Sequence, residues 1–393
     1  MPAHDRHQQR RAAAARARTE ARAHVARPSP LLAGGAAVLV VVAIAAGAWL
    51  AASHPAAPPA AGVDVTPVAL PTFAADAPQN VLEPTGPEIL TPTPGVAGPT
   101  AVVVTNSPWQ VLIARGAVRD LTAPSGVAVD ADGNVWVVDF EGDFVQKFSP
   151  GGQALNRLGQ KGNAPGQLAG PSGLAIDAQG NLYVADTNNH RIQKFSPAGQ
   201  ALASWGKGGD GPGQFQLPTG VAVDEQGRVY VADRGNHRIQ VLSASGEPLA
   251  QWGSRGPAPG QFWAPSGIAV DDKGQVFVAD STNQRVQVLS NTGQPLAQWG
   301  WEGTDPGQFE FPSGVAVDAS GNVYVSDTRN NRVQKLSPSG QPLAVWGVVV
   351  GAGTPRPSPE AGTFNAPGGI AVDREGAVYV VDTRNARVQK LKQ

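Results

Sequence analysis

Cysteine is absent from this chain of 393 residues, which excludes disulfide bonds, thiol catalysis and metal sites built from thiolates. Histidine is scarce, and only His190 and His237 of the six histidines follow residue 54. Neither sign of charge is in excess, because 30 basic residues balance 31 acidic ones, so a uniformly basic surface for nucleic acid is not predicted. The sequence also lacks a phosphate-binding loop, a nucleophile elbow and a Ser/His/Asp spacing. We therefore predict no catalytic residue, metal site or cofactor.

The chain is instead rich in glycine, with 48 residues, and in proline, with 35, and much of it is repeated. Near copies of segment 218–243 begin at six prolines, which are Pro124, Pro171, Pro218, Pro265, Pro312 and Pro367. Successive copies are 47 residues apart four times and 55 residues apart once. A fixed period of this length is typical of solenoids and propellers.

The pattern within one copy predicts β-strands. Valine recurs at alternate positions in 220–224 and in 228–233, so alternate side chains share one face of an extended chain. An Asp-x-x-Gly turn separates these segments, in which Asp224 can bond forward to the backbone and Gly227 accepts a positive φ. Two further strands are predicted at 238–243 and 248–253. Four antiparallel strands per repeat make one propeller blade.

The two ends of the repeat region complement each other. The last copy stops after its third strand, at 387–392, and lacks a fourth. Segment 108–115, just before the first copy, has the composition of a strand but no partner in its own repeat. We expect it to supply the outer strand of the sixth blade and so to close the ring, which removes open sheet edges. The predicted fold class is all-β, a six-bladed β-propeller over 108–393.

Five copies contain the pattern D-x-x-N-x-R-(I/V)-Q at the start of the third strand, which reads Asn189-His190-Arg191 in one and Asn236-His237-Arg238 in the next. On these residues the chain resembles the NHL repeat family, and the resemblance covers 109–393. It implies a six-bladed propeller, which is usual in that family. Some NHL propellers bind nucleic acid through a basic face, and others form the extracellular sensor part of bacterial receptor kinases.

The Asp, Asn and Arg of this pattern are predicted to be structural. An arginine can donate to a carboxylate in a fork, and an asparagine can satisfy the backbone of a turn. A group that is repeated in five blades is typical of a scaffold rather than of a ligand site. The five groups are Asp186, Asn189 and Arg191; Asp233, Asn236 and Arg238; Asp280, Asn283 and Arg285; Asp327, Asn330 and Arg332; and Asp382, Asn385 and Arg387.

Ligand-binding residues are expected where the copies differ, on the face that collects the links between second and third strands and the crossovers between blades. In the first copy, Phe140 and Glu141 either form an acidic, aromatic subsite or mark drift in a terminal blade. The longer crossover at 348–364 either covers the central opening or is a surface insertion. The remaining candidates are His190, His237, Arg234, Arg329, Arg384, Trp263 and Trp301.

Three segments precede the repeats. Residues 1–30 carry seven arginines and two acids, 31–52 carry no charge, and 53–107 contain eleven prolines. A helix of 22 residues reaches about 33 Å, enough to cross a hydrocarbon core of about 30 Å, and the preceding arginines place its N-terminus in the cytoplasm. We expect a cytoplasmic arm, an uncleaved signal anchor and a disordered stalk, with a cleaved signal peptide as the alternative.

These features predict a propeller displayed outside a bacterial cell membrane by a single transmembrane helix. We expect a non-enzymatic binding, scaffold or sensor module whose ligand is a protein, a peptide or a wall polymer. The alternative is a metal-assisted lyase or hydrolase, because six-bladed relatives such as the peptidylglycine amidating lyase and the gluconolactonase-like hydrolases hold a metal at the ring axis. The repeats offer only two histidines for such a site, His190 and His237, in adjacent copies.

Overall fold

The computed structural model describes residues 102–103, 109–114, 121–347 and 360–391, all within one compact unit, Val81–Gln393. The predicted arm and anchor, 1–30 and 31–52, lie outside the described residues, as do most of the predicted stalk and the first part of the insertion, 348–359. No helix in the described residues is long and apolar enough to cross a membrane.

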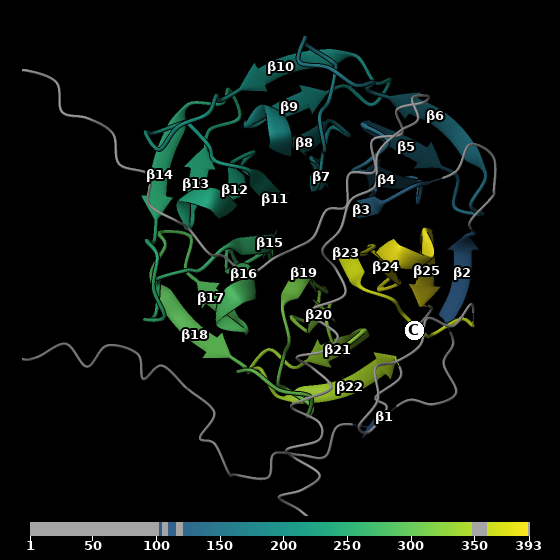
Figure 1. The fold of residues 1–393 in the computed structure, drawn as a ribbon, viewed down its shortest axis with the longest axis vertical. Coiled ribbons are helices and arrows are strands. Elements are labelled where there is room, and N and C mark those ends of the chain that lie inside the picture. The colour runs from purple at the N-terminus through teal and green to yellow at the C-terminus, as the bar shows by residue number, and fades with distance from the viewer. Residues whose placement is uncertain (1–101, 104–108, 115–120, 348–359, 392–393) are drawn as a thin grey trace, which may run out of the picture. The chain divides into compact units, whose positions relative to one another are not determined.

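Six antiparallel sheets, called blades 1 to 6, lie around one axis with their first strands innermost (Figure 1). Blade 1 contains β3 (Pro124–Val129), β4 (Val135–Asp139), β5 (Phe144–Phe148) and β6 (Ala154–Leu158); blade 2 contains β7 (Leu174–Ile176), β8 (Leu182–Asp186), β9 (Arg191–Phe195) and β10 (Ala201–Trp205); blade 3 contains β11 (Pro218–Val223), β12 (Val229–Asp233), β13 (Arg238–Leu242) and β14 (Pro248–Trp252). Blade 4 contains β15 (Pro265–Val270), β16 (Val276–Asp280), β17 (Arg285–Leu289) and β18 (Pro295–Trp299); blade 5 contains β19 (Pro312–Val317), β20 (Val323–Asp327), β21 (Arg332–Leu336) and β22 (Pro342–Gly347); blade 6 contains β23 (Pro367–Val372), β24 (Val378–Asp382), β25 (Arg387–Leu391) and β2 (Trp109–Ile113). Short 3₁₀ turns, η1 (Thr187–Asn189), η2 (Arg234–Asn236), η3 (Ser281–Asn283) and η4 (Thr383–Asn385), link the second and third strands in four blades. The predicted all-β, six-bladed propeller is confirmed.

The hydrophobic core lies between neighbouring blades. All five residues of each second strand are buried, because its two faces pack against two different blades. Tyr230 of β12 lies in one cluster with Trp252 of its own blade and Val276 of blade 4. Val231, the next residue along β12, lies in another cluster with Tyr183 of blade 2. Alternate residues of one strand therefore stabilise two successive interfaces.

The ring is closed by a strand from the other end of the repeat region, as the sequence predicts. Strand β2 pairs antiparallel with β25, with Trp109 opposite Leu391. Trp109 is buried and packs edge-on against Phe364, with ring centroids 5.2 Å apart. A two-residue strand that falls within the predicted stalk, β1 (Val102–Val103), also pairs in parallel with β22 of blade 5. The segment before the repeats is therefore attached to two blades.

The innermost strands approach one another so closely that one position requires glycine. A Cβ atom added to Gly220 in β11 would lie 2.2 Å from the carbonyl oxygen of Ser266 in β15. The hydroxyl of Thr219 donates to the same oxygen across 3.2 Å. Equivalent hydroxyls, which also donate to a carbonyl of the next blade, are Ser125, Ser172, Ser266 and Ser313. The sixth position is Gly368, which has no hydroxyl, so the seam between blades 6 and 1 cannot form this bond.

Candidate functional site

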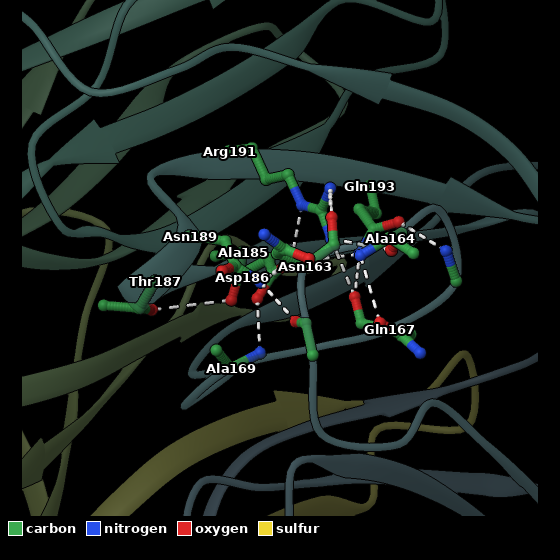
Figure 2. A network of polar contacts seen from close by, with 12 residues as sticks. Asn163, Ala164, Gln167, Ala169, Ala185, Asp186, Thr187, Asn189, Arg191 and Gln193 are labelled. Atoms are coloured by element: carbon green, nitrogen blue, oxygen red, sulfur yellow. Dashed lines mark hydrogen bonds and ion pairs between the residues drawn. The ribbon is translucent and has the colours of Figure 1, made fainter.

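A buried carboxylate at the end of each second strand organises the loops of one face. In blade 2 this residue is Asp186, which is fully buried (Figure 2). Its Oδ1 accepts a hydrogen bond from the backbone N–H of Ala169 at 2.7 Å. Its Oδ2 accepts from Asn189 Nδ2 at 2.9 Å, from Arg191 Nε at 2.7 Å and from Gln193 Nε2 at 3.0 Å. The carboxylate is therefore saturated with donors.

The arginine extends this network to the crossover that enters the blade. Arg191 Nη1 donates to the carbonyl of Asn163 at 2.7 Å, and Nη2 donates to the carbonyls of Ala164 and Gln167 at 3.0 and 2.8 Å (Figure 2). Gln193 Nε2 donates to the carbonyl of Gln167 as well. The crossovers and the links between second and third strands therefore lie together on one face, here called the crossover face.

The same carboxylate and arginine recur in blades 3 to 6, so their structural assignment agrees with their contacts. The Asp–Arg ion pairs are Asp233–Arg238, Asp280–Arg285, Asp327–Arg332 and Asp382–Arg387, with N–O distances of 2.6 to 2.8 Å. The glutamine that ends the D-x-x-N-x-R-(I/V)-Q pattern also donates to the buried aspartate, so each group has four members and not the three predicted. In blades 2 to 6 this glutamine is Gln193, Gln240, Gln287, Gln334 and Gln389. Burial raises the pKa of Asp280 and Asp327, so these anions depend on their arginines and on the other donors that lower it.

Blade 1 replaces this network with a different one. Asp139 accepts from both the backbone and the hydroxyl of Thr122, and Phe144 stands where the other blades have arginine. Phe144 is buried and is covered by the guanidinium of Arg157, 3.6 Å from the ring centroid. Of the two candidates in this blade, Phe140 is half-buried and Glu141 is exposed.

Both candidate histidines bond to the next blade. His190 Nδ1 accepts from the backbone N–H of Leu217 at 3.1 Å, and His237 Nδ1 accepts from that of Ala264 at 3.0 Å. The same position accepts the equivalent N–H in three other blades, through Asp143, Gln284 and Asn331 at 2.7, 2.6 and 2.7 Å. The side-chain acceptor at this position links each of five blades to the next, and we call this hydrogen bond the clamp. Histidine, aspartate, glutamine and asparagine all supply it. Blade 6 has Ala386 here, which carries no acceptor.

The clamp at His237 should make stability depend on pH. Its pKa lies below the usual value of 6.5, chiefly because of burial and next because of the positive charge of Arg255. Below about pH 6.5, His237 of the unfolded chain takes up a proton, whereas His237 of the folded chain does so only at a lower pH. The free energy of unfolding should therefore fall as the pH is lowered from about 6.5 to the pKa of His237 in the folded protein. His237→Gln keeps the acceptor, as Gln284 does, without titrating there. Urea denaturation should show a smaller loss between pH 7 and pH 5 for the variant, and equal losses would contradict the clamp.

The exposed large hydrophobic side chains of the crossover face, Leu217, Trp263 and Trp301, all lie in the crossovers that enter blades 3 to 5. The two residues directly before the first strand differ from blade to blade. They are Gln216 and Leu217 in blade 3, Trp263 and Ala264 in blade 4, and Glu310 and Phe311 in blade 5. In blades 1, 2 and 6 the same two positions hold only Thr, Ala, Gly or Asn. Trp263 and Trp301 are 41% and 38% exposed, whereas the other tryptophans of the described residues are buried or half-buried. The face is therefore asymmetric although its scaffold is repeated.

The three candidate arginines lie in blades 3, 5 and 6. Arg234 begins η2, next to the buried Asp233. The guanidinium of Arg329 lies 3.8 Å from the ring centroid of Phe311 and 3.8 Å from Glu310, so it is partly neutralised. Arg384 is exposed, and its backbone N–H donates to the carbonyl of Asn365. Each arginine therefore has a different setting on the same face.

One seam gathers several candidates together. Between blades 3 and 4, the guanidinium of Arg255 lies 4.7 Å from the ring centroid of Trp263. His237 lies close enough to both Arg255 and Arg234 for their charges to lower its pKa, after burial. Sequence reasoning missed Arg255, although the equivalent positions in three other copies hold Lys161, Gly208 and Glu302. This variation between copies is the sequence signal that could have identified Arg255 as a candidate.

The metal-assisted alternative needs a cluster of ligands at one place. Within residues 102–103, 109–114, 121–347 and 360–391, no group of three or more His, Asp or Glu side chains could hold a metal ion. His190 and His237 each direct Nδ1 to a backbone N–H, so only Nε2 of each ring remains for another partner.

Known proteins share both the repeat and the fold. A model of the NHL repeat matches 121–148, 168–195, 215–242, 262–289, 309–336 and 364–391. No curated protein sequence matches the chain. Each matched segment begins before the first strand of a blade and ends with or beside its third strand.

Solved structures with low sequence identity have a similar fold. A catalytically inactive virginiamycin B lyase from Staphylococcus aureus with quinupristin is 15% identical, covers 72% of this chain and 99% of its own, and has a TM-score of 0.53. An auxiliary nutrient binding protein from Bacteroides thetaiotaomicron is 12% identical, covers 72% and 76%, and has a TM-score of 0.56. At such identities the likeness concerns the fold alone. With six matched repeats that form six blades, the chain belongs to the NHL repeat family as a six-bladed β-propeller.

Proposed function

We propose that the protein is a non-enzymatic binding propeller whose ligand docks on the crossover face over blades 3 to 5. One observation carries the proposal: the exposed large hydrophobic side chains of this face are found there, on a scaffold that is otherwise repeated. The exposed rings of Trp263 and Trp301 supply apolar area, and Arg255 and Arg329 lie against aromatic rings beside them. Exposed aromatic residues and arginines are the residue types enriched in binding surfaces.

The proposal includes the place where the propeller acts. The uncharged segment 31–52 would hold the chain in a cell membrane, with the propeller outside and a protein, peptide or wall polymer as its ligand. Protease added to intact spheroplasts should remove the propeller if it is displayed outside. Protection until the membrane is broken would contradict this topology.

Chemical footprinting can locate the binding face. Full-length protein in detergent would be mixed with an envelope extract, and oxidation of exposed side chains would be measured by mass spectrometry. We expect Trp263 and Trp301 to be protected, and the turn residues Lys273 and Glu375 on the opposite side of the strands to stay reactive. Chelation of divalent metal should not change this pattern.

Two variants provide the matched comparison. Trp263→Glu should abolish the protection at Trp301, because it places a charge in the apolar part of the surface. Lys273→Glu, which also adds negative charge but on the other face, should leave the protection unchanged. Protection only on the opposite face, or protection that needs a divalent metal, would overturn the proposed function.

A further inference from the structure

Two arginines at the seam between blades 3 and 4 have no acidic partner. Arg234 and Arg255 are both exposed, and neither side chain makes an ion pair or a hydrogen bond with any residue that the structure describes. Arg329 in blade 5 shows the contrast, since Glu310 lies 3.8 Å from it. The seam therefore carries positive charge that is not neutralised locally.

The two carboxylates whose charges act on His237 at this seam do not contact these arginines. Asp233 and Asp280 are fully buried, and each accepts from a backbone N–H, an asparagine, an arginine and a glutamine. His237 adds a donor at the same seam, because its Nδ1 accepts from Ala264 and the neutral ring must then carry its proton on Nε2. Although Arg234 is exposed, partial desolvation of its guanidinium lowers its pKa.

An aromatic face lies beside these donors. Arg255 lies over the ring of Trp263, which is still 41% exposed. Guanidinium groups donate in a fork to carboxylates, and exposed indole rings offer a flat apolar surface next to a polar tip. A ring that carries a carboxylate, as in a uronic acid, satisfies both requirements at once.

The arrangement fits a sparsely charged polymer better than a nucleic acid. A nucleic acid carries one charge per nucleotide and needs a continuous basic surface. Here the crossover into blade 5 carries Glu302 and the half-buried Glu310 in addition to the exposed Trp301. We propose that the seam between blades 3 and 4 binds the carboxylate of an acidic polysaccharide, with a sugar ring against Trp263. This inference rests on the proposed function and names the ligand class of that face.

The neighbouring seam is an internal control. Between blades 4 and 5, Ser281, Gln284 and Glu302 occupy the positions of Arg234, His237 and Arg255. The crossover between blades 2 and 3 has Gly208 at the position of Arg255. Arg234→Ser with Arg255→Gly therefore introduces only residues that other copies already accommodate at these positions, so the double variant should fold.

The test uses full-length protein in detergent and hyaluronan as the probe, because this polymer carries a uronic acid carboxylate on only every second sugar, with dextran as the uncharged polymer. We expect saturable binding of hyaluronan, at least about 10-fold weaker for Arg234→Ser/Arg255→Gly and undetectable for dextran. Lys273→Gly/Arg374→Ser removes the same charge from exposed turns of the opposite face and should bind as the unchanged protein does. Equal thermal stability of the variants shows that folding is not the cause, and Arg255→Glu alone provides a second test if the double variant is unstable.

Several outcomes would overturn the inference. Equal binding by the double variant and the control would show that the seam is not the site. Equal affinity for poly-glutamate or for single-stranded DNA would show charge attraction without recognition of a sugar ring. If no polysaccharide binds while Trp263 and Trp301 are still protected by the envelope extract, the inference fails and the proposed function stands.

Discussion

Removal of β2 is expected to lower the free energy of unfolding by at least about 5 kcal/mol and to open blade 6. Trp109 and Ile113 are 3% and 2% exposed, and both pair with β25, as do the two residues after Trp109. Loss of a buried tryptophan costs about 3–5 kcal/mol and loss of a buried isoleucine about 2–5 kcal/mol. The edge of β25 would also be left unpaired and free to recruit another chain.

Two truncated chains make this a matched comparison. One begins at residue 106 and retains β2, whereas the other begins at residue 116 and lacks it. Urea denaturation gives the stability of each, and light scattering reports association through the exposed edge. If the two chains had equal stability, β2 would not be the strand that closes the ring.

Replacement of Asp327 by alanine is expected to cost about 3–5 kcal/mol, because it leaves a buried guanidinium without its anion. Arg332, its partner, is 1% exposed, and Asp327 itself is fully buried. The carboxylate also accepts from the backbone N–H of Glu310 and from Gln334, so the crossover into blade 5 should loosen together with the blade. Thermal or urea denaturation measures the loss.

Two further variants separate the ion pair from the general effect of substitution. Asp327→Leu combined with Arg332→Met removes both charges and should be clearly more stable than Asp327→Ala. Asp272→Asn, at an exposed turn, should change the stability by no more than about 0.5 kcal/mol. A double variant as unstable as Asp327→Ala would show that the unpaired arginine is not the cause.

Much of the fold could be predicted because its signals are local and repeated. The period of 47 residues and the alternation in each strand give the blade, and the missing fourth strand of the last copy identifies 108–115 as its replacement. The D-x-x-N-x-R pattern predicts a structural role, because a group that is identical in five blades is typical of a scaffold. The contacts of Asp186 and Arg191 agree with that interpretation.

The candidate site was harder to predict because its contacts cross between blades. The sequence predicts His190 and His237 as ligand-binding candidates, yet each accepts a hydrogen bond from a backbone N–H at the start of the next blade. Only the spatial arrangement shows that Gln284 does the same task. Arg255 joins Trp263 through a crossover whose residues vary, so no recurring pattern marks it. The pairing of β1 with β22 could not be predicted either, because two valines are too few to show the alternation that identifies a strand.

The pairing of β2 with β25 also sets the order in which the protein can be completed during synthesis. Trp109 leaves the ribosome long before its partner Leu391, and at about 5–20 residues per second the interval is roughly 15–55 s. The four antiparallel strands of each of blades 1 to 5 are consecutive in the chain and can form in that time, whereas β2 must wait unpaired. The last seam to assemble lies between blades 6 and 1, where Gly368 and Ala386 supply neither of the side-chain bonds found at the other seams. A nascent chain that stalls before residue 387 therefore displays an open strand to chaperones and proteases.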